Sequence, residues 1–190
     1  MAGGRRPDGI PAAAAPRSAT ERYASHCRWL EAAAHLERNG TGHPVVRLLH
    51  RDPERLAIAT LFAGTATAFS RPLSPPSTAQ LLTAVAAALG RLHASGLVHG
   101  NVTGDHILIR GSRFSLCSPS GRTPDDGLEP ADDVAAFAPL ITGLLSLWDA
   151  PRSPWTLDSA AQRRWEDLSR IACDPSMSAA RLARRLESLQ

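Results

Sequence analysis

The chain has 190 residues, of which 43% are hydrophobic, enough for one domain or for two small lobes that share a core. No single apolar run has the length of a membrane span, and residues 1–17 lack the apolar centre of a secretory signal. We therefore expect a cytoplasmic protein. The net charge of +3 does not by itself indicate a nucleic-acid partner.

Two residue types restrict the chemistry. The three cysteines, Cys27, Cys117 and Cys173, are far apart and odd in number, which argues against a disulfide framework and a zinc site, so we expect buried free thiols. All 21 Lys+Arg residues are arginine. Any reaction step that needs a lysine amine is therefore excluded.

The first third of the chain predicts a tail, one helix and one hairpin. Residues 1–17 lack hydrophobic periodicity and predict a disordered tail. Ser18 and Glu21 have the spacing of a capping box, which predicts a helix that Asn39-Gly40 ends. Its apolar face is formed by Tyr23, Cys27, Trp29, Leu30 and Ala34. An antiparallel hairpin of 45–51 and 55–62 and a linker of 63–76 follow.

The remainder is mainly helical. Ser77, with Gln80 three residues later, predicts the start of a helix that Gly96 stops. Two short apolar runs, 107–109 and 114–116, predict a second hairpin, followed by a loop over 118–130. A helix then opens at Asp132-Asp133, and its Pro139 marks either a kink or a late first turn. The last two helices are expected over 158–173 and 178–189.

The predicted elements follow one another in the order found in a protein kinase, and several segments of residues 18–190 resemble that family. Leu92 to Asn101 is similar to the stretch that leads into the kinase catalytic loop, and Val102 to Leu108 continues as that loop does. The segment after the kinase first-lobe helix is similar to His43 to Val46. The start of the central kinase helix is similar to Asp133-Val134, and the last two kinase helices are similar to Leu168 to Leu186. Gly104 to Leu108 and the short following loop also resemble aminoglycoside-phosphotransferase-like enzymes, so that branch stays open.

This resemblance implies an α+β, protein-kinase-like fold: a mostly helical C-lobe and a reduced N-lobe of one helix plus a β-hairpin. The implied organisation is a tail at 1–17, the reduced N-lobe and linker at 18–75, and the C-lobe at 76–190.

The resemblance also implies that the catalytic machinery is degenerate. The catalytic aspartate falls at Asn101, whose amide cannot act as a base, and the loop lysine falls at Thr103. The two metal ligands fall at His106 and Ser118, which are poor ligands for magnesium. We therefore expect no catalytic residue, no cofactor and no metal.

Other parts of a kinase site are also missing. No strand pair with a glycine-rich turn precedes the first helix; Gly3-Gly4 lies in the tail. Glu31 corresponds to the helix glutamate that pairs with the missing lysine, and we expect it to have no partner. Asp105 is the only acid left in the loop and is expected to be a turn residue.

Two residues outside the chemistry are retained. In kinases the counterpart of His99 packs against and hydrogen-bonds the catalytic loop, and the counterpart of Asp133 ties down the backbone of that loop. The resemblance therefore implies that His99 and Asp133 are structural anchors. A metal site formed by His99 and His106 is the weaker interpretation, because no further ligand but Asp105 lies at a suitable spacing.

The sequence thus predicts a catalytically inactive kinase-like domain that binds a protein, as a regulatory, scaffold or docking subunit of a peptide-modifying enzyme complex. The alternative is an atypical small-molecule or peptide phosphotransferase with substituted residues. The basic face of the last helix could instead attract an acidic partner or nucleic acid, although a protein is the expected partner. The basic face consists of Arg181, Arg184 and Arg185. The four tryptophans are either core residues or anchors at a protein interface: Trp29, Trp148, Trp155 and Trp165.

Overall fold

The computed structural model describes residues 18–37, 45–61, 64, 66–70, 72–111, 113–120, 127–151 and 153–189. These residues form a mixed α+β fold, as the sequence predicts. In chain order the elements are α1 (Ala19–Glu37), β1 (Leu48–Asp52), β2 (Ala57–Thr60), β3 (Ala66–Thr67), α2 (Pro75–Ala94), the 3₁₀ turn η1 (Gly104–His106), β4 (Ile107–Arg110), β5 (Arg113–Leu116), α3 (Pro130–Ala135), α4 (Phe137–Trp148), α5 (Ser159–Ala172) and α6 (Ala179–Glu187).

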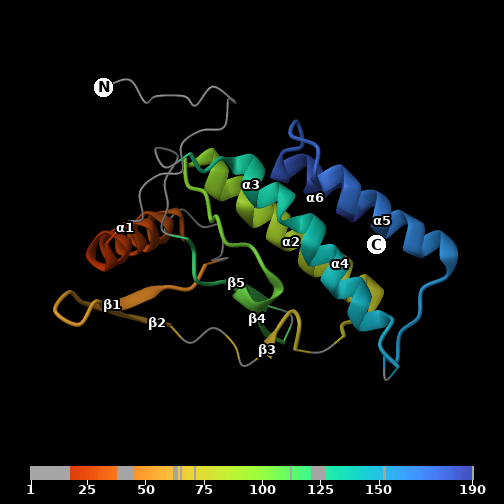
Figure 1. The fold of residues 1–190 in the computed structure, drawn as a ribbon, viewed down its shortest axis with the longest axis horizontal. Coiled ribbons are helices and arrows are strands. Elements are labelled where there is room, and N and C mark those ends of the chain that lie inside the picture. The colour runs from red at the N-terminus through yellow and green to blue at the C-terminus, as the bar shows by residue number, and fades with distance from the viewer. Residues whose placement is uncertain are drawn as a thin grey trace.

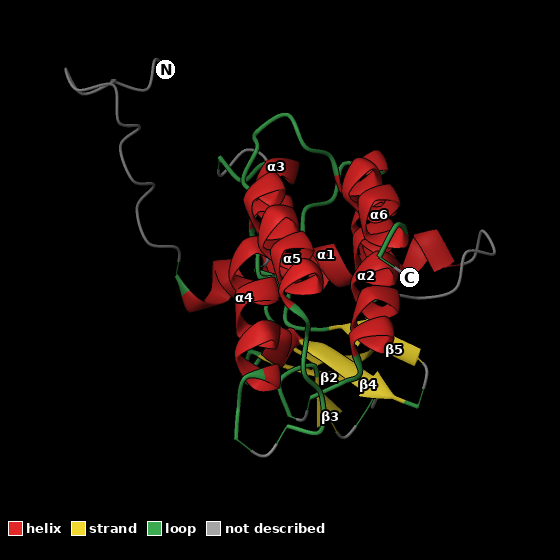
Figure 2. Cartoon of the chain, turned by 90° about the vertical axis from the view of Figure 1, so that its right-hand side faces the viewer, coloured by secondary structure: helices red, strands yellow, loops and turns green. Residues whose placement is uncertain are grey.

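The long helix α2 lies inside a bundle formed by the C-terminal half of the chain. It packs against α6, while α4 packs against α5 (Figures 1 and 2). Its residues Leu82, Val85 and Leu89 recur at helical spacing and are completely buried. Because α1 contributes Trp29 and Leu30 to the same core cluster, one hydrophobic core extends across both parts of the chain.

The start of α2 differs from the prediction. Ser74, not Ser77, is the N-cap residue: its hydroxyl accepts a hydrogen bond from the backbone N–H of Ser77, and Pro75 is the first helical residue. Proline suits that position because its N–H would have no helical partner and its φ is already helical. The helix therefore begins three residues earlier than the capping-box spacing suggests.

The helix predicted at Asp132-Asp133 is divided in two at Ala136. Pro139 lies in the first turn of α4, the second of the two roles expected for it, where its missing N–H costs nothing. By length and composition alone, Pro130–Trp148 could cross a membrane, contrary to the expectation that no run could. The segment is 44% buried, and Phe137, Ile141 and Leu144 are among its residues in the core.

Near the N-terminus the predicted capping box is confirmed: Ser18 N donates to Glu21, and Glu21 N donates to Ser18 Oγ. The predicted hairpin is confirmed as the antiparallel pair β1–β2, which projects from α1 away from the bundle (Figure 1). A bulge at Leu49 interrupts its register. Three predicted features lie outside the described residues: the tail at 1–17, the helix stop Asn39-Gly40, and His43-Pro44.

The predicted linker 63–76 contains a short strand, β3, that the sequence does not indicate. It pairs with β4, which pairs with β5 in the second predicted hairpin, so a three-stranded antiparallel sheet lies beneath the bundle (Figure 2). The last two helices are confirmed, with Asp158 and Ser178 as their N-cap residues.

The cysteines only partly meet expectation. Cys27 is buried, Cys117 is half-buried, and Cys173 is exposed beyond the end of α5, so the prediction of three buried thiols is wrong. Trp29, Trp148 and Trp165 are core residues, whereas Trp155 is 39% exposed.

Candidate functional site

The candidate site is the loop 97–106, which connects α2 to β4 and is held by one buried carboxylate. Asp133 on α3 is 1% exposed. Its Oδ2 accepts a hydrogen bond from the backbone N–H of His99 at 2.8 Å, and its Oδ1 accepts one from the N–H of Gly100 at 2.6 Å. The predicted contact of Asp133 with this loop is therefore present. Charge-assisted hydrogen bonds of this kind are among the strong ones in proteins.

A third group on Asp133 comes from α2 and was not predicted. Nε2 of His93 lies 2.9 Å from Asp133 Oδ2. His93 is in the last turn of α2, and Asp133 is in the short helix α3. One carboxylate therefore joins the end of α2, the loop and the start of α3.

His99 holds the loop through its backbone hydrogen bonds and the packing of its ring, whereas a side-chain hydrogen bond was expected. Its backbone N–H donates to Asp133, and its carbonyl accepts from Ser120 N at 2.8 Å. Its fully buried ring packs edge-on against Trp29, with ring centroids 5.7 Å apart. The ring approaches the backbone of Cys117, but neither ring nitrogen has a hydrogen-bond partner. The expected hydrogen bond from the side chain is thus absent from the described residues, and the ring contributes packing.

The electrostatics of the site keep that ring neutral. Burial, with smaller contributions from His106 and His26, lowers the pKa of His99 to about 4, although Asp133 and the Cys117 backbone oppose the shift. At neutral pH the ring is therefore uncharged and does not neutralise Asp133.

The backbone around Gly100 is tightly enclosed. Gly100 has φ of +69°, and a Cβ atom there would lie 2.4 Å from side-chain atoms of both Leu128 and Ser120. On the other side of the loop, Trp29 Nε1 donates to the carbonyl of Val98 at 2.7 Å. The loop is thus fixed from α1 as well as from α3. Sequence reasoning could not identify the bond from Trp29, because it joins residues 69 positions apart.

The structure brings together all four positions predicted to be degenerate. Asn101 Nδ2 donates to the carbonyl of Ser118 at 2.8 Å. His106 Nδ1 lies 3.1 Å from Thr103 Oγ1 and 3.0 Å from the carbonyl of Asn101. These polar groups bond to one another and to the backbone, so the loop and the segment after β5 are tied together by neutral contacts.

The charged candidates have separate positions. Asp105 is exposed in η1, next to His106 in the chain. Glu31, for which no partner was expected, forms an ion pair with Arg51 of β1 at 2.8 Å, which corrects that expectation. Both side chains are about half exposed, so the pair stabilises the contact of α1 with the hairpin only slightly. Within the described residues, no three His, Cys, Asp or Glu side chains are grouped as metal ligands.

Comparisons with known proteins add no homologue. The chain matches no protein-family model, and no curated protein matches it either. The interpretation of the site therefore depends on its sequence and geometry.

Proposed function

We propose that this chain is a catalytically inactive protein-kinase-like domain that binds a protein partner in the cytoplasm. Its role would be that of a regulatory or docking subunit of an enzyme that modifies a peptide. The resemblance at residues 92–108 and the order of elements support the fold assignment: a helix and a hairpin, then a long helix, an anchored loop, a short hairpin and further helices.

The observation that carries the proposal is the contrast between the anchor and the loop it holds. Asp133 binds two backbone N–H groups of the loop, as the kinase resemblance implies for this position. The loop positions that would handle phosphate and metal carry no carboxylate, and Asn101 and Thr103 bond to neighbouring loop atoms or side chains. This contrast supports a loop that resembles that of a phosphotransferase but lacks a base and a metal-binding carboxylate at these positions.

The exposed apolar residues support binding as the remaining function. Leu49, Leu56 and Leu61 of the β1–β2 hairpin are 57%, 38% and 52% exposed. Among the described strands, β1 and β2 pair only with each other. Exposed apolar side chains and strand edges that can pair with a further strand are features that protein partners use.

The decisive test is a transfer assay. Purified chain is incubated with labelled ATP, magnesium or manganese, and generic proteins or peptides, with an active kinase as positive control. We expect no transfer above background, because lysine, the loop aspartate and both metal ligands are replaced. Transfer that Asn101→Ala abolishes would instead establish the atypical phosphotransferase.

A further inference from the structure

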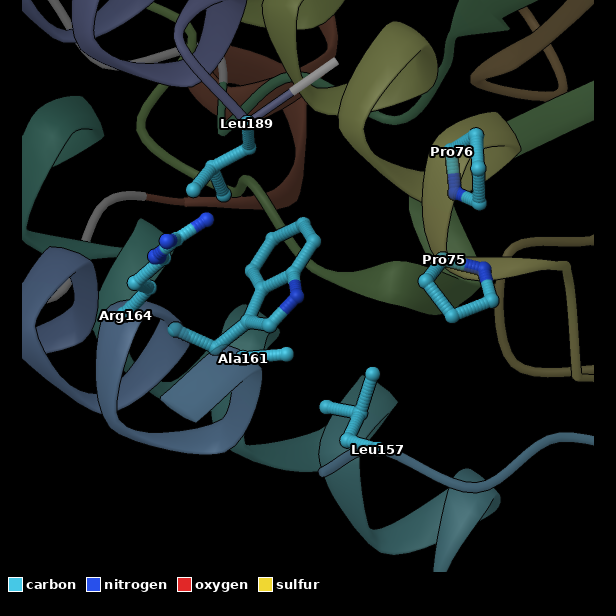
Figure 3. A pocket seen from close by; sticks show the side chains of 7 residues that line it. Pro75, Pro76, Leu157, Ala161, Arg164 and Leu189 are labelled. Atoms are coloured by element: carbon cyan, nitrogen blue, oxygen red, sulfur yellow. The ribbon is translucent and has the colours of Figure 1, made fainter. Parts of the chain in front are cut away.

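A small pocket lies on the side of the bundle remote from the candidate site, where the start of α2 meets α5 and the C-terminal end of the chain. Its volume is about 100 Å³. Its walls come from α2, the segment before α5, α5 itself and the end of α6 (Figure 3). The lining residues are Pro75, Pro76, Leu157, Ala161, Arg164, Trp165 and Leu189.

The walls of this pocket are rigid. The ring of Trp165 packs edge-on against Trp148, with centroids 5.4 Å apart. Nε1 of Trp148 in turn donates to the carbonyl of Leu73 at 2.7 Å, just before α2. Pro75 and Pro76 have fixed φ angles and no N–H group, so the wall they form is stiff and apolar. A pocket that is already formed costs little ordering on binding.

Polar groups are few among these apolar walls. The lining includes the indole of Trp165, whose residue is 4% exposed, and the guanidinium of Arg164. An apolar pocket with few polar groups is typical of a site for one side chain of a ligand. A cavity of about 150 Å³ can hold benzene. A space of about 100 Å³ therefore suits one side chain of roughly leucine size.

The nearest arginine is part of the pocket itself. Arg164 lines the pocket, and Arg185 is exposed on α6, four residues before the lining residue Leu189; within the described residues neither has an ion-pair partner. The nearby acid Asp158 caps the backbone of α5, although its charge also interacts with Arg164.

Three further acids of these helices have to be weighed. Asp167 pairs with Arg170, Glu166 accepts a hydrogen bond from Gln162, and Glu187 is exposed on α6. Arg164 in the lining and the exposed Arg185 of α6 thus favour a ligand with carboxylates next to its apolar side chain. In addition Trp155, two residues before Leu157, is exposed and can contact a chain that leaves the pocket.

We propose that this pocket binds an extended acidic peptide segment of the partner protein and takes up one leucine-sized side chain, while Arg164 and Arg185 bind its flanking carboxylates. This inference rests on the proposed protein-binding function and places a peptide-binding surface on the helical bundle, separate from the β1–β2 hairpin.

The test is a selection from a displayed library of random twelve-residue peptides on the intact chain, followed by affinity measurement with individual synthetic peptides. We expect enriched peptides to share one Leu, Ile, Met or Val next to Asp or Glu. Ala161→Phe fills the pocket without changing charge, and Arg164→Glu reverses the charge of its rim. Each change should weaken binding of these peptides at least tenfold.

Arg163→Glu is the matched control, because it makes the same charge change on the same helix at an exposed position that does not line the pocket. It should change affinity less than threefold, and unchanged circular dichroism should show that all variants are folded. The proposal is overturned if no peptide is enriched, if enriched peptides lack the acidic and apolar pair, or if Ala161→Phe leaves binding intact. It is also overturned if an oligonucleotide binds in an Arg164-dependent but Ala161-independent manner. None of these outcomes affects the transfer assay, so the proposed loss of catalysis is judged separately.

Discussion

At the scale of single residues, Asp133 explains how the loop 97–106 is held in its shape. A buried carboxylate is tolerated only when hydrogen bonds compensate its lost hydration. The N–H groups of His99 and Gly100 and the ring of His93 supply that compensation. Removing the carboxylate leaves buried donors without an acceptor, which is more costly than losing an exposed hydrogen bond.

We therefore expect Asp133→Ala to lower the free energy of unfolding by about 2–4 kcal/mol. Asn101→Ala loses one hydrogen bond to Ser118 and should cost within about 1 kcal/mol. Asp105→Ala, an exposed acid of the same loop, is the control and should be nearly neutral. Urea denaturation of the three variants measures these values. If Asp133→Ala is harmless and Asn101→Ala unfolds the domain, the assigned roles are reversed.

His99 should make stability depend on pH. Its pKa is about 4 in the folded chain, against 6.5 when unfolded, so between these values the unfolded state binds more protons. Its contribution is complete above pH 6.5 and is lost as the pH falls toward 4, by roughly 3 kcal/mol.

The variant His99→Leu keeps an apolar side chain but cannot titrate, so it isolates this contribution. Measured by denaturation from pH 7 to pH 4, wild type should lose stability faster than the variant. Parallel curves would mean that the ring titrates with the same pKa in the folded and the unfolded chain.

These residues also mark how far the sequence predicts the site. The Asp133 contact was predictable because a short motif implies it. The contributions of His93 and Trp29 were not, because they depend on how α1 and α2 pack against the loop. The same applies to the ring of His99, for which the motif implies a hydrogen bond and the surrounding side chains leave none.

At the scale of elements, the sequence predicts the helices and hairpins with hydrophobic periodicity and errs where tertiary contacts decide. Two caps compete at the start of α2, and Pro75 favours the earlier one. The strand β3 has only two residues and exists because β4 offers a free edge. The sequence also does not indicate why glycine is needed at Gly64 and Gly104. Only the packed structure shows how closely Ile109 approaches Gly64 and how closely Phe69 approaches Gly104.

A substitution in α4 tests this dependence on packing. In an exposed helix, replacing glycine with alanine stabilises by up to about 1 kcal/mol. Here a Cβ atom on Gly143 would lie 2.8 Å from the ring of Phe69, and a Cβ atom on Gly104 would lie 2.5 Å from the same ring. Because the ring is enclosed by both glycines, we expect Gly143→Ala to destabilise the chain and to lower its melting temperature.

The matched change is Gly96→Ala, which meets no neighbouring atom and tests only the cost of its φ of +75°. A rise in melting temperature for Gly143→Ala would show that Phe69 has room to shift.

At the scale of the whole molecule, a chain without lysine and without a metal-binding acid in the loop should have little affinity for nucleotide. We expect no ATP binding in calorimetry with magnesium present, because the phosphates would have no cationic partner in the loop. A dissociation constant below about 100 µM, which corresponds to about −5.5 kcal/mol, would favour the phosphotransferase. A parallel titration with magnesium alone is the control for metal binding.

The Asp133 junction also has a consequence for the order in which the chain folds. Its partners His93, His99 and Gly100 precede it by 40, 34 and 33 residues, so each contact closes a long loop. Closing such loops has an entropic cost before any contact energy is gained. The helices α2 and α3 must therefore meet before the loop acquires its shape. We infer that the loop is among the last parts to become ordered during folding, and that separation of α3 from α2 would release it first.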